Sequence, residues 1–305
     1  MLLCVDVGNT QISLGLYATD TESPGSDSED IVRPPLVDQW RMRTDPRMTA
    51  DEMQVSLDAM LGRHAERVTG VAALSTVPSI LRELRIMAER RQERTPMVIV
   101  GPRVRTGVPI LVDNPKEVGA DRVVNTLAAH RLFDTTCVVV DFGTSTNIDV
   151  VSARGEFLGG ALAPGIEISL DALVTRAAQL TTVELLRPRS VIGKNTVECL
   201  QAGIIFGFAG QVDGLVRRIL AELSGSANDH GRVTVIATGG LAPLVIGESE
   251  TIGEHVDDLT LLGLRLVYLR SARNTARSTI VRSGSSNSRS SAPAPDSPSS
   301  GTPAR

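Results

Sequence analysis

The feature that most constrains this chain is a motif that occurs twice. Residues 2–10 read LLCVDVGNT and residues 138–146 read VVVDFGTST, so an apolar run leads each time into an aspartate, one further residue and a glycine. Strand-like sequence resumes after each glycine, which predicts a hairpin with the motif at its turn. Two copies in a chain of 305 residues indicate an internal duplication and two similar domains.

The order of the predicted elements supports this duplication. The first half predicts strands at 2–8, 11–18 and 38–44, a helix after the capping box TADE at 49–52, a strand at 71–76, a helix from Pro78, a strand at 97–101 and a helix at 121–132. The second half predicts strands at 138–143, 146–153 and 156–163, a helix from Ile166, a long helix at 195–224, a strand at 233–240 and an apolar helix at 259–269. Three strands followed by alternating helices and strands, written twice, predict an α/β fold whose two domains face a cleft.

We therefore divide the chain into a first domain, residues 1–132, and a second domain, residues 133–272. Residues 19–37 are acidic and rich in Ser, Pro and Gly, which predicts a flexible insertion in the first domain. Residues 273–305 are rich in Ser, Pro, Ala and Arg, and this composition predicts a disordered tail.

Composition excludes several classes of protein. A net charge of −4 offers no basic face for nucleic acid. No stretch approaches the roughly 20 apolar residues of a membrane span, and the N-terminus lacks the basic region of a signal peptide. The three cysteines are widely spaced and odd in number, which favours free thiols in a reducing cytoplasm. We expect a cytoplasmic enzyme that binds neither nucleic acid nor membrane.

The first copy of the motif has the composition of a phosphate-binding turn. Ligands of such sheets bind at the carboxyl ends of strands, where this turn lies. Gly8 lets backbone N–H groups approach an anion closely, and Asn9 and Thr10 add side-chain donors. Asp6 beside a phosphate would be repulsive without a bridging cation, so it implies Mg²⁺. A plain hairpin turn explains a single copy equally well.

The second copy makes a plain hairpin turn a less favourable explanation, because the same motif recurs at the corresponding place of the second domain. Gly143 again lets a ligand approach the backbone closely, and the Thr144 hydroxyl can reach a phosphate. Asp141 adds a carboxylate suited to a cation. In GADR at 119–122, Asp121 can be the N-cap of a helix or a base that accepts the proton of an attacking hydroxyl, and the two roles are compatible. Arg122 can hold that carboxylate or one on a substrate.

Two further motifs each allow two interpretations. In GKNT at 193–196, Asn195 or Thr196 caps the long helix, or the helix N-terminus binds a polar or anionic substrate group. TGG at 238–240 is a plain turn, or it permits the close approach of a flat ring such as adenine.

Longer motifs carry a family resemblance. They are DVGNT, WRMRT followed by TADE, DNPKEVGADR (113–122), VDFGTST, GEFLGGALAPG (155–165), GKNTVECLQAGIIFGFAGQVDG (193–214) and DLTLLGL (258–264). With these motifs the chain resembles the type III pantothenate kinases of bacteria, within the acetate and sugar kinase/Hsp70/actin superfamily, from residue 1 to about residue 270. The resemblance implies two ribonuclease-H-like domains, each a βββαβαβα unit, that flank a nucleotide cleft.

The resemblance also implies an activity: ATP-dependent phosphorylation of pantothenate to 4′-phosphopantothenate, the first step of coenzyme A synthesis. It implies a homodimer with the substrate pocket near the subunit interface, Mg²⁺ with the ATP, and a monovalent cation, K⁺ or NH₄⁺. Asp121 falls on the catalytic base and Asp141 on the ligand of the monovalent cation. Matching positions give ATP contacts at Asp6, Val7, Gly8, Asn9, Thr10, Gln11, Ile12, Ser13 and Thr144, and substrate contacts at Gly119, Ala120, Asp121, Arg122 and Thr196.

A few positions depart from the family pattern. Ser145 stands where many members have alanine, Gln11 where Asn or Thr is common, and Val112 where many place a tyrosine against the substrate. None of these removes a carboxylate. Two alternatives stay open: a catalytically silent paralogue that acts as a regulatory or binding protein, and a superfamily kinase or phosphatase with another substrate. The intact aspartates argue against silence, and the acidic charge argues against DNA binding.

Overall fold

The structure, a computed structural model, describes residues 1–19, 34–91, 95–101, 104, 106–177, 180, 182–225 and 231–286, with the backbone alone for 274–286. Most of the insertion predicted at 19–37, namely residues 20–33, lies outside the described residues, as does the end of the predicted tail from residue 287.

The first sheet has five strands in the order β3-β2-β1-β4-β5. Strand β1 is central; it pairs antiparallel with β2 and parallel with β4, and β2 pairs antiparallel with β3. The strands are β1 (Leu2–Val7), β2 (Gln11–Tyr17), β3 (Leu36–Arg43), β4 (Gly70–Ser75) and β5 (Met97–Ile99).

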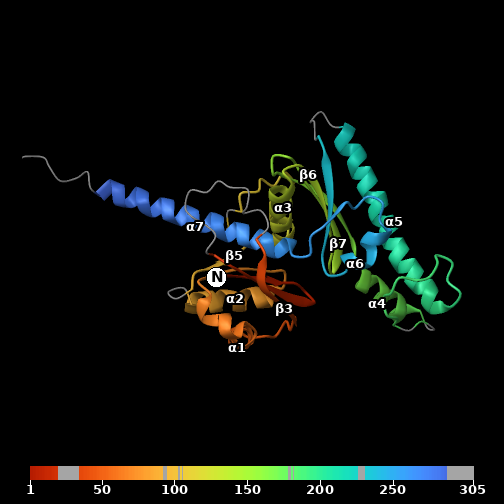
Figure 1. Ribbon diagram of the computed structural model, residues 1–305, viewed down its shortest axis with the longest axis horizontal. Helices are drawn as coiled ribbons and strands as arrows, with labels where there is room; N and C mark the ends of the chain where they lie inside the picture. Colours follow the sequence, from red (N-terminus) through yellow and green to blue (C-terminus); the bar gives the residue numbers. More distant parts are fainter. Residues whose placement is uncertain are drawn as a thin grey trace, which may run out of the picture.

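The second sheet repeats this topology with the order β10-β9-β6-β7-β8. Strand β6 takes the place of β1, antiparallel to β7 and parallel to β9. The predicted duplicated α/β fold is therefore confirmed (Figure 1). The strands are β6 (Thr136–Phe142), β7 (Ser145–Val151), β8 (Phe157–Pro164), β9 (Val233–Thr238) and β10 (Glu254–His255).

Helices cover the outer face of each sheet. On the first, α1 (Ala50–Leu61) opens with the predicted capping box: the Thr49 hydroxyl accepts from the Glu52 N–H and the Glu52 carboxylate accepts from the Thr49 N–H. Its apolar face joins that of α2 (Pro78–Arg91) in one buried cluster with the sheet. The helices of the second sheet are α4 (Ile166–Arg176), α5 (Thr196–Gly225) and α6 (Ala242–Val245); short 3-10 turns occur at Gly62–Arg67, Pro115–Glu117 and Ile246–Glu248.

Two helices pack between the sheets, and each covers the sheet of the other half of the sequence. Helix α3 (Ala120–Phe133) packs on β6 and β7, whereas α7 (Leu259–Ser286) packs on β1, β2 and β4 (Figure 1). The two helices also contact each other closely. A Cβ atom at Gly263 of α7 would lie 2.2 Å from the Val124 carbonyl oxygen of α3, so glycine is needed at this crossing.

Two helices differ from the expectations. Helix α5 was predicted as a long helix, but it was not predicted to be long and apolar enough to cross a membrane by length and composition; 56% of its apolar window is buried. That burial is explained by packing against the second sheet through Ile204, Phe208 and Val212. Helix α7 continues to Ser286, past residue 272, where the ordered chain was predicted to end. Residues 273–286 contain no proline, the strongest helix breaker, and the first proline beyond the helix is Pro293.

The crossing of α3 and α7 gives a direct stability prediction. Gly263→Ala should lower the free energy of unfolding by about 1–3 kcal/mol, because the added methyl group pushes the two backbones apart. Urea denaturation measures the change. Gly247→Ala is the control, since a Cβ atom there meets nothing within 4 Å; equal stability for the two variants would contradict the close crossing.

Candidate active site

A cleft of about 360 Å³ lies between the two sheets. It lies beside the ends of β1 and β6, where the two hairpin turns face each other across it. Strands, turns and the first turn of α7 all contribute to its lining. The predicted residues that line it are Asp6, Gly8, Asn9, Thr10, Gln11, Ser13, Asp121, Asp141 and Thr144.

Each hairpin turn is closed by a backbone hydrogen bond. The Gly8 N–H donates to the Gln11 carbonyl over 3.0 Å, and the Gly143 N–H donates to the Ser145 carbonyl over 3.1 Å. The Thr10 and Thr144 hydroxyls lie 3.4 Å apart, so one residue of each turn meets the other across the cleft. A polyanion in the cleft would therefore meet polar groups from both turns.

Thr44, the last residue of the WRMRT motif, holds the first turn in place. Its hydroxyl donates to the Gly8 carbonyl over 2.7 Å, and its backbone N–H donates to the Thr10 carbonyl over 3.0 Å. Since Thr44 is buried, these bonds are shielded from water. The turn is therefore positioned by a residue far along the chain.

Two predicted ATP contacts point away from the cleft. Val7 and Ile12 are 0% and 1% exposed and belong to the buried core between the first sheet and α1 and α2. Their side chains alternate with those of Asp6 and Ser13 along the strands, as the two-residue period of a strand requires. Only their backbones remain available to a ligand.

Three aspartates bring negative charge to this cleft from separate stretches of chain. Burial, followed by the charges of Asp121 and Asp141, raises the pKa of Asp6 to about 7. Burial, followed by the charges of Asp121 and Asp149, raises the pKa of Asp141 to about 7. These carboxyl groups oppose one another's ionisation, which favours cations in the cleft.

Asp121 stands in the first turn of α3, and it is not the N-cap. The helix begins at Ala120, and its N-cap is Gly119, which makes no side-chain capping bond. A Cβ atom at Gly119 would lie 2.4 Å from Asp121 Oδ1, so the carboxylate folds back over the glycine. The N-cap interpretation of Asp121 was wrong, whereas its position in the cleft lining fits that of a base.

Arg122 is occupied by a partner that the sequence did not indicate. Its Nε donates to Asp149 Oδ1 over 2.9 Å, and its Nη2 donates to the same oxygen. The guanidinium also lies over the Phe157 ring, 5.4 Å from the centroid. Arg122 therefore connects the start of α3 to β7. It does not bind Asp121, and it does not line the cleft.

Asn125, one turn beyond Asp121, connects three elements. Its Nδ2 donates to Asp141 Oδ2 of β6 over 3.2 Å, and its Oδ1 accepts from the Thr260 hydroxyl at the start of α7 over 2.8 Å. Asn125 itself is 1% exposed, and both bonds are partly buried. The orientation of the Asp141 carboxylate thus depends on the crossing of α3 and α7.

The remaining predicted substrate positions lie outside the cleft lining. Gly119 and Ala120 support Asp121 at the start of α3. Val112 lies against Gly159 of β8: a Cβ atom on that glycine would be 3.7 Å from Val112 Cγ1. Thr196 is exposed and begins α5.

The carboxylates of the cleft suit cations that also keep water or phosphate ligands. Among the described residues, no group of three or more His, Cys, Asp or Glu is arranged to hold a metal ion together. Mg²⁺ characteristically keeps several waters and binds one or two carboxylates plus substrate phosphates. Asp6 and Asp141, charged oxygens beside polar turns, suit that mode of binding.

Comparison with known proteins decides the family. A sequence model of type III pantothenate kinases matches residues 2–218. This chain belongs to the type III pantothenate kinase family. A family protein from Saccharopolyspora erythraea is 69% identical over 270 residues, which cover 88% of this chain and 98% of the relative. One from Frankia alni is 60% identical over 268 residues, covering 88% and 98%.

Solved structures share the fold at low sequence identity. A Campylobacter jejuni protein assigned to the Baf family of transcriptional activators superimposes with a TM-score of 0.52 at 14% identity, covering 89% of this chain and 99% of that one. A Sinorhizobium meliloti protein named as a 2-dehydro-3-deoxygalactonokinase gives 0.50 at 16%, covering 88% and 98%. Both likenesses concern the fold alone.

Sequence reasoning missed several residues of the site. Asn125 and Thr260 are ordinary polar residues of helices, and Thr44 and Arg41 belong to a strand motif that was recognised without a role. The TGG motif was recognised, and Thr238, Gly239 and Gly240 line the cleft. A signal for Asn125 was available, since residues four apart on a helix share a face with Asp121.

Burial of Asp141, together with the charges of Asp121 and Asp149, predicts a pH effect on the ligand-free protein. The pKa of Asp141 is about 7 in the fold, against an ordinary value of 3.8. A raised pKa adds stability at low pH, and this stability is lost as pH rises from about 4 through 7. Asp141→Asn cannot ionise, so it should raise Tm by a few degrees at pH 8 and by much less at pH 5.

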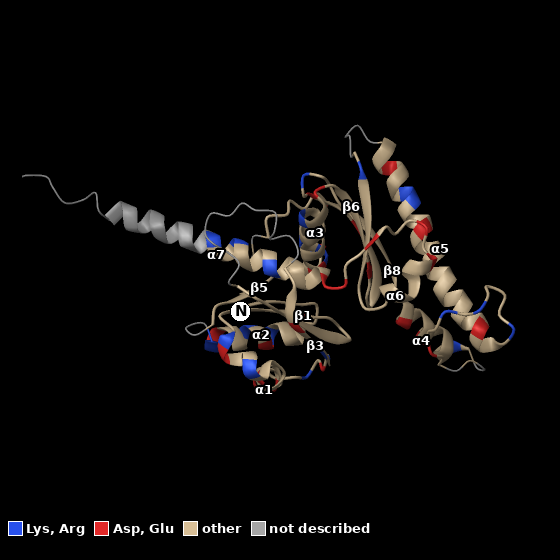
Figure 2. Ribbon diagram, viewed as in Figure 1, with Lys and Arg blue, Asp and Glu red and all other residues tan. Residues whose placement is uncertain are grey.

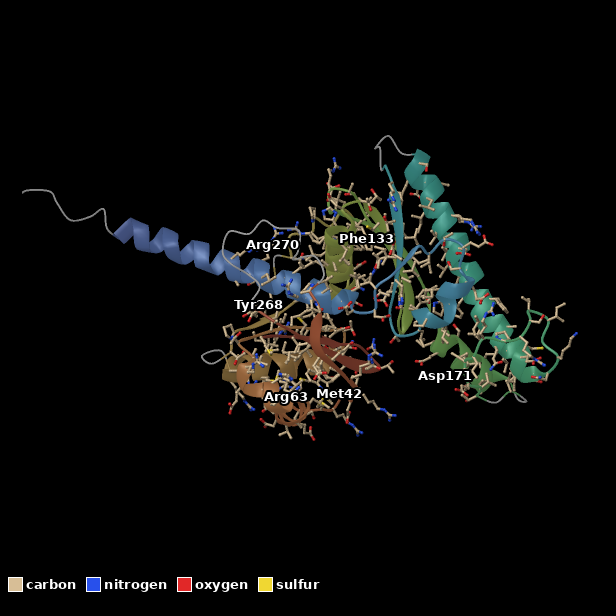
Figure 3. The ribbon with its side chains drawn as sticks, in the orientation of Figure 1. Met42, Arg63, Phe133, Asp171, Tyr268 and Arg270 are labelled. Atoms are coloured by element: carbon tan, nitrogen blue, oxygen red, sulfur yellow. The ribbon has the colours of Figure 1, made fainter. Side chains whose placement is uncertain are left out.

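Scanning calorimetry in a buffer without K⁺ and Mg²⁺ measures this difference. Asp171→Asn is the control, because Asp171 is an exposed carboxylate of α4 outside the cleft lining (Figure 3). A gain for Asp141→Asn that is equal at both pH values would contradict the repulsion.

Proposed function

We propose that this protein transfers the γ-phosphoryl group of ATP to the primary hydroxyl of pantothenate and forms 4′-phosphopantothenate. The observation that carries the proposal is the convergence of Asp6, Asp121 and Asp141 on one cleft between duplicated sheets. Relatives 56–69% identical over most of the chain are named as type III pantothenate kinases, which supports the choice of substrate.

Asp121 is the proposed general base. Catalysis of phosphoryl transfer is almost entirely positioning and electrostatic stabilisation, and an aspartate commonly accepts the proton of the attacking hydroxyl. Asp121 is held at the start of α3, which is fixed on the second sheet by the Arg122–Asp149 pair. From there its carboxylate can orient the substrate hydroxyl towards the γ-phosphorus.

The two hairpin turns bind the triphosphate in this proposal. Gly8, Asn9 and Thr10 approach it from the first sheet, and Thr144 approaches from the second. Asp6 would bind Mg²⁺ together with phosphate oxygens and water. Asp141 would bind a monovalent cation, K⁺ or NH₄⁺. Bound ions would supply the positive charge that lets both carboxyl groups ionise.

A homodimer completes the proposal. Seven of the ten large apolar side chains that are exposed among the described residues belong to the second half, and such concentration marks an interaction surface. Thr196 does not line the cleft of its own chain, so a substrate contact by this residue would come from a second copy. The exposed residues of this set are Leu162, Ile168, Leu173, Leu186, Val191, Ile192 and Val197.

We also propose that the enzyme acts in the cytoplasm. Cys4 and Cys137 are buried free thiols, and Cys199 is an exposed free thiol. Burial raises the pKa of the Cys137 thiol to about 11. Free thiols of this kind are typical of a reducing compartment.

The catalytic role of Asp121 is tested by replacing it. Asp121→Asn should lower kcat by about 10²–10⁴-fold, because the amide cannot accept the proton. A coupled ADP assay with pantothenate, Mg·ATP and K⁺ measures turnover, and calorimetric titration with a non-hydrolysable ATP analogue checks that binding is retained. Near-normal turnover of the variant would refute the base, and absence of turnover in the unmodified protein would favour a silent regulatory paralogue.

The dimer surface is tested by one charge. Leu162→Glu places a carboxylate on a side chain that is 66% exposed on β8, and it should shift the protein from dimer to monomer and raise KM for pantothenate. Sedimentation velocity measures the assembly. Val55→Glu is the control, because Val55 is 69% exposed but lies on α1 of the first half. A dimer unchanged by Leu162→Glu would exclude this surface.

A further inference from the structure

The cleft lining is strongly acidic for a site that takes a polyanion. Its described carboxylates are those of Asp6, Asp121, Asp141, Glu167, Asp257 and Asp258. Figure 2 marks acidic positions in red on the chain that enters α7. Among the described lining residues, Arg41 of β3 is the one basic side chain. Arg122, the nearest basic residue in sequence to the proposed base, is paired with Asp149 instead.

The register of the first sheet places Arg41 in line with the first turn. Asp6 of β1 pairs with Ser13 of β2, and Ser13 pairs with Arg41 of β3. Directly paired residues of antiparallel strands project from the same face. Asp6, Ser13 and Arg41 therefore form one row across three strands, and two strand spacings of about 4.8 Å separate its ends.

The neighbours of Arg41 fix the direction in which it points. Trp40 and Met42 are packed against the buried cluster of the first sheet. The alternation along β3 then leaves Gln39, Arg41 and Arg43 on the opposite face of the sheet, the face that also carries Asp6 and Ser13. Among the described residues, the side chain of Arg41 has no hydrogen-bond partner and no ion-pair partner. Its guanidinium is therefore available to a ligand.

We propose that Arg41 binds phosphate oxygens of ATP from the side of the first sheet, a further nucleotide contact beyond the two turns. The inference rests on the proposed kinase function. A guanidinium presents donors in a planar fork that matches phosphate oxygens, and its charge offsets the surrounding carboxylates. Ser13, next to Arg41 in the row, belongs to the stretch that the family resemblance assigns to ATP.

Direct binding measurements test the proposal, and the chain provides its own control. Arg43 lies on the same strand and face, two residues on, paired with Gln11, and it does not line the cleft. Isothermal titration calorimetry would compare adenosine, ADP and Mg·AMP-PNP on the full chain and on Arg41→Gln, Arg41→Lys and Arg43→Gln. Circular dichroism would confirm that each variant is folded.

Arg41→Gln should weaken Mg·AMP-PNP about tenfold or more, since one charge-assisted hydrogen bond of a buried ligand is lost. Arg41→Lys should lie between this variant and the unmodified protein, and Arg43→Gln should bind normally. Adenosine affinity should stay unchanged in all of them. In steady-state assays, KM for ATP should rise with Arg41→Gln while KM for pantothenate is unaltered.

Two results would overturn the assignment. Equal losses of nucleotide affinity in Arg41→Gln and Arg43→Gln, or no loss in either, would exclude a specific phosphate contact. Recovery of an Arg41→Glu variant by Glu167→Arg would instead assign Arg41 to an ion pair across the cleft with α4. Failure of the unmodified protein to bind Mg·AMP-PNP would refute the kinase proposal itself, an outcome distinct from both.

Discussion

The mutual repulsion of carboxyl groups in a shared cleft is the constraint on which the rest of this structure depends. Asp6, Asp121 and Asp141 approach one another because two sheets and a helix converge, and burial adds to the opposition between their charges. A fold that retains such a cluster does so against its own stability. The cluster becomes useful when cations and a polyanion enter together, since each then compensates the other.

The crossing of α3 and α7 is what brings the cluster together. Helix α3 follows the first sheet in sequence but packs on the second, and α7 does the reverse. The backbone contact of Gly263 with Val124 and the hydrogen bond of Thr260 with Asn125 both lock the crossing of α3 and α7. Movement of one sheet relative to the other would therefore act directly on the Asp141 carboxylate.

Much of the fold was predictable because the deciding signals are local. The hairpin turns, the capping box at Thr49 and the apolar periodicity of the helices each act within a few residues. Duplication then gave the topology, because two copies of one pattern require two similar sheets. The end of α7 was set too early, since composition marks residues 273–286 as a tail although no proline interrupts the helix there.

The sequence by itself determined which residues could do chemistry: the aspartates at strand and helix ends, the glycines of the turns and the hydroxyls beside them. Only the tertiary structure decided which of them share a cleft, that Arg122 is bound to Asp149, and that Val7 and Ile12 face the core. It also set Arg41 in one row with Asp6 through the register of three strands. The physical reason is that propensities and caps act between near neighbours, whereas these contacts join residues that only the packing of sheets and crossing helices brings together.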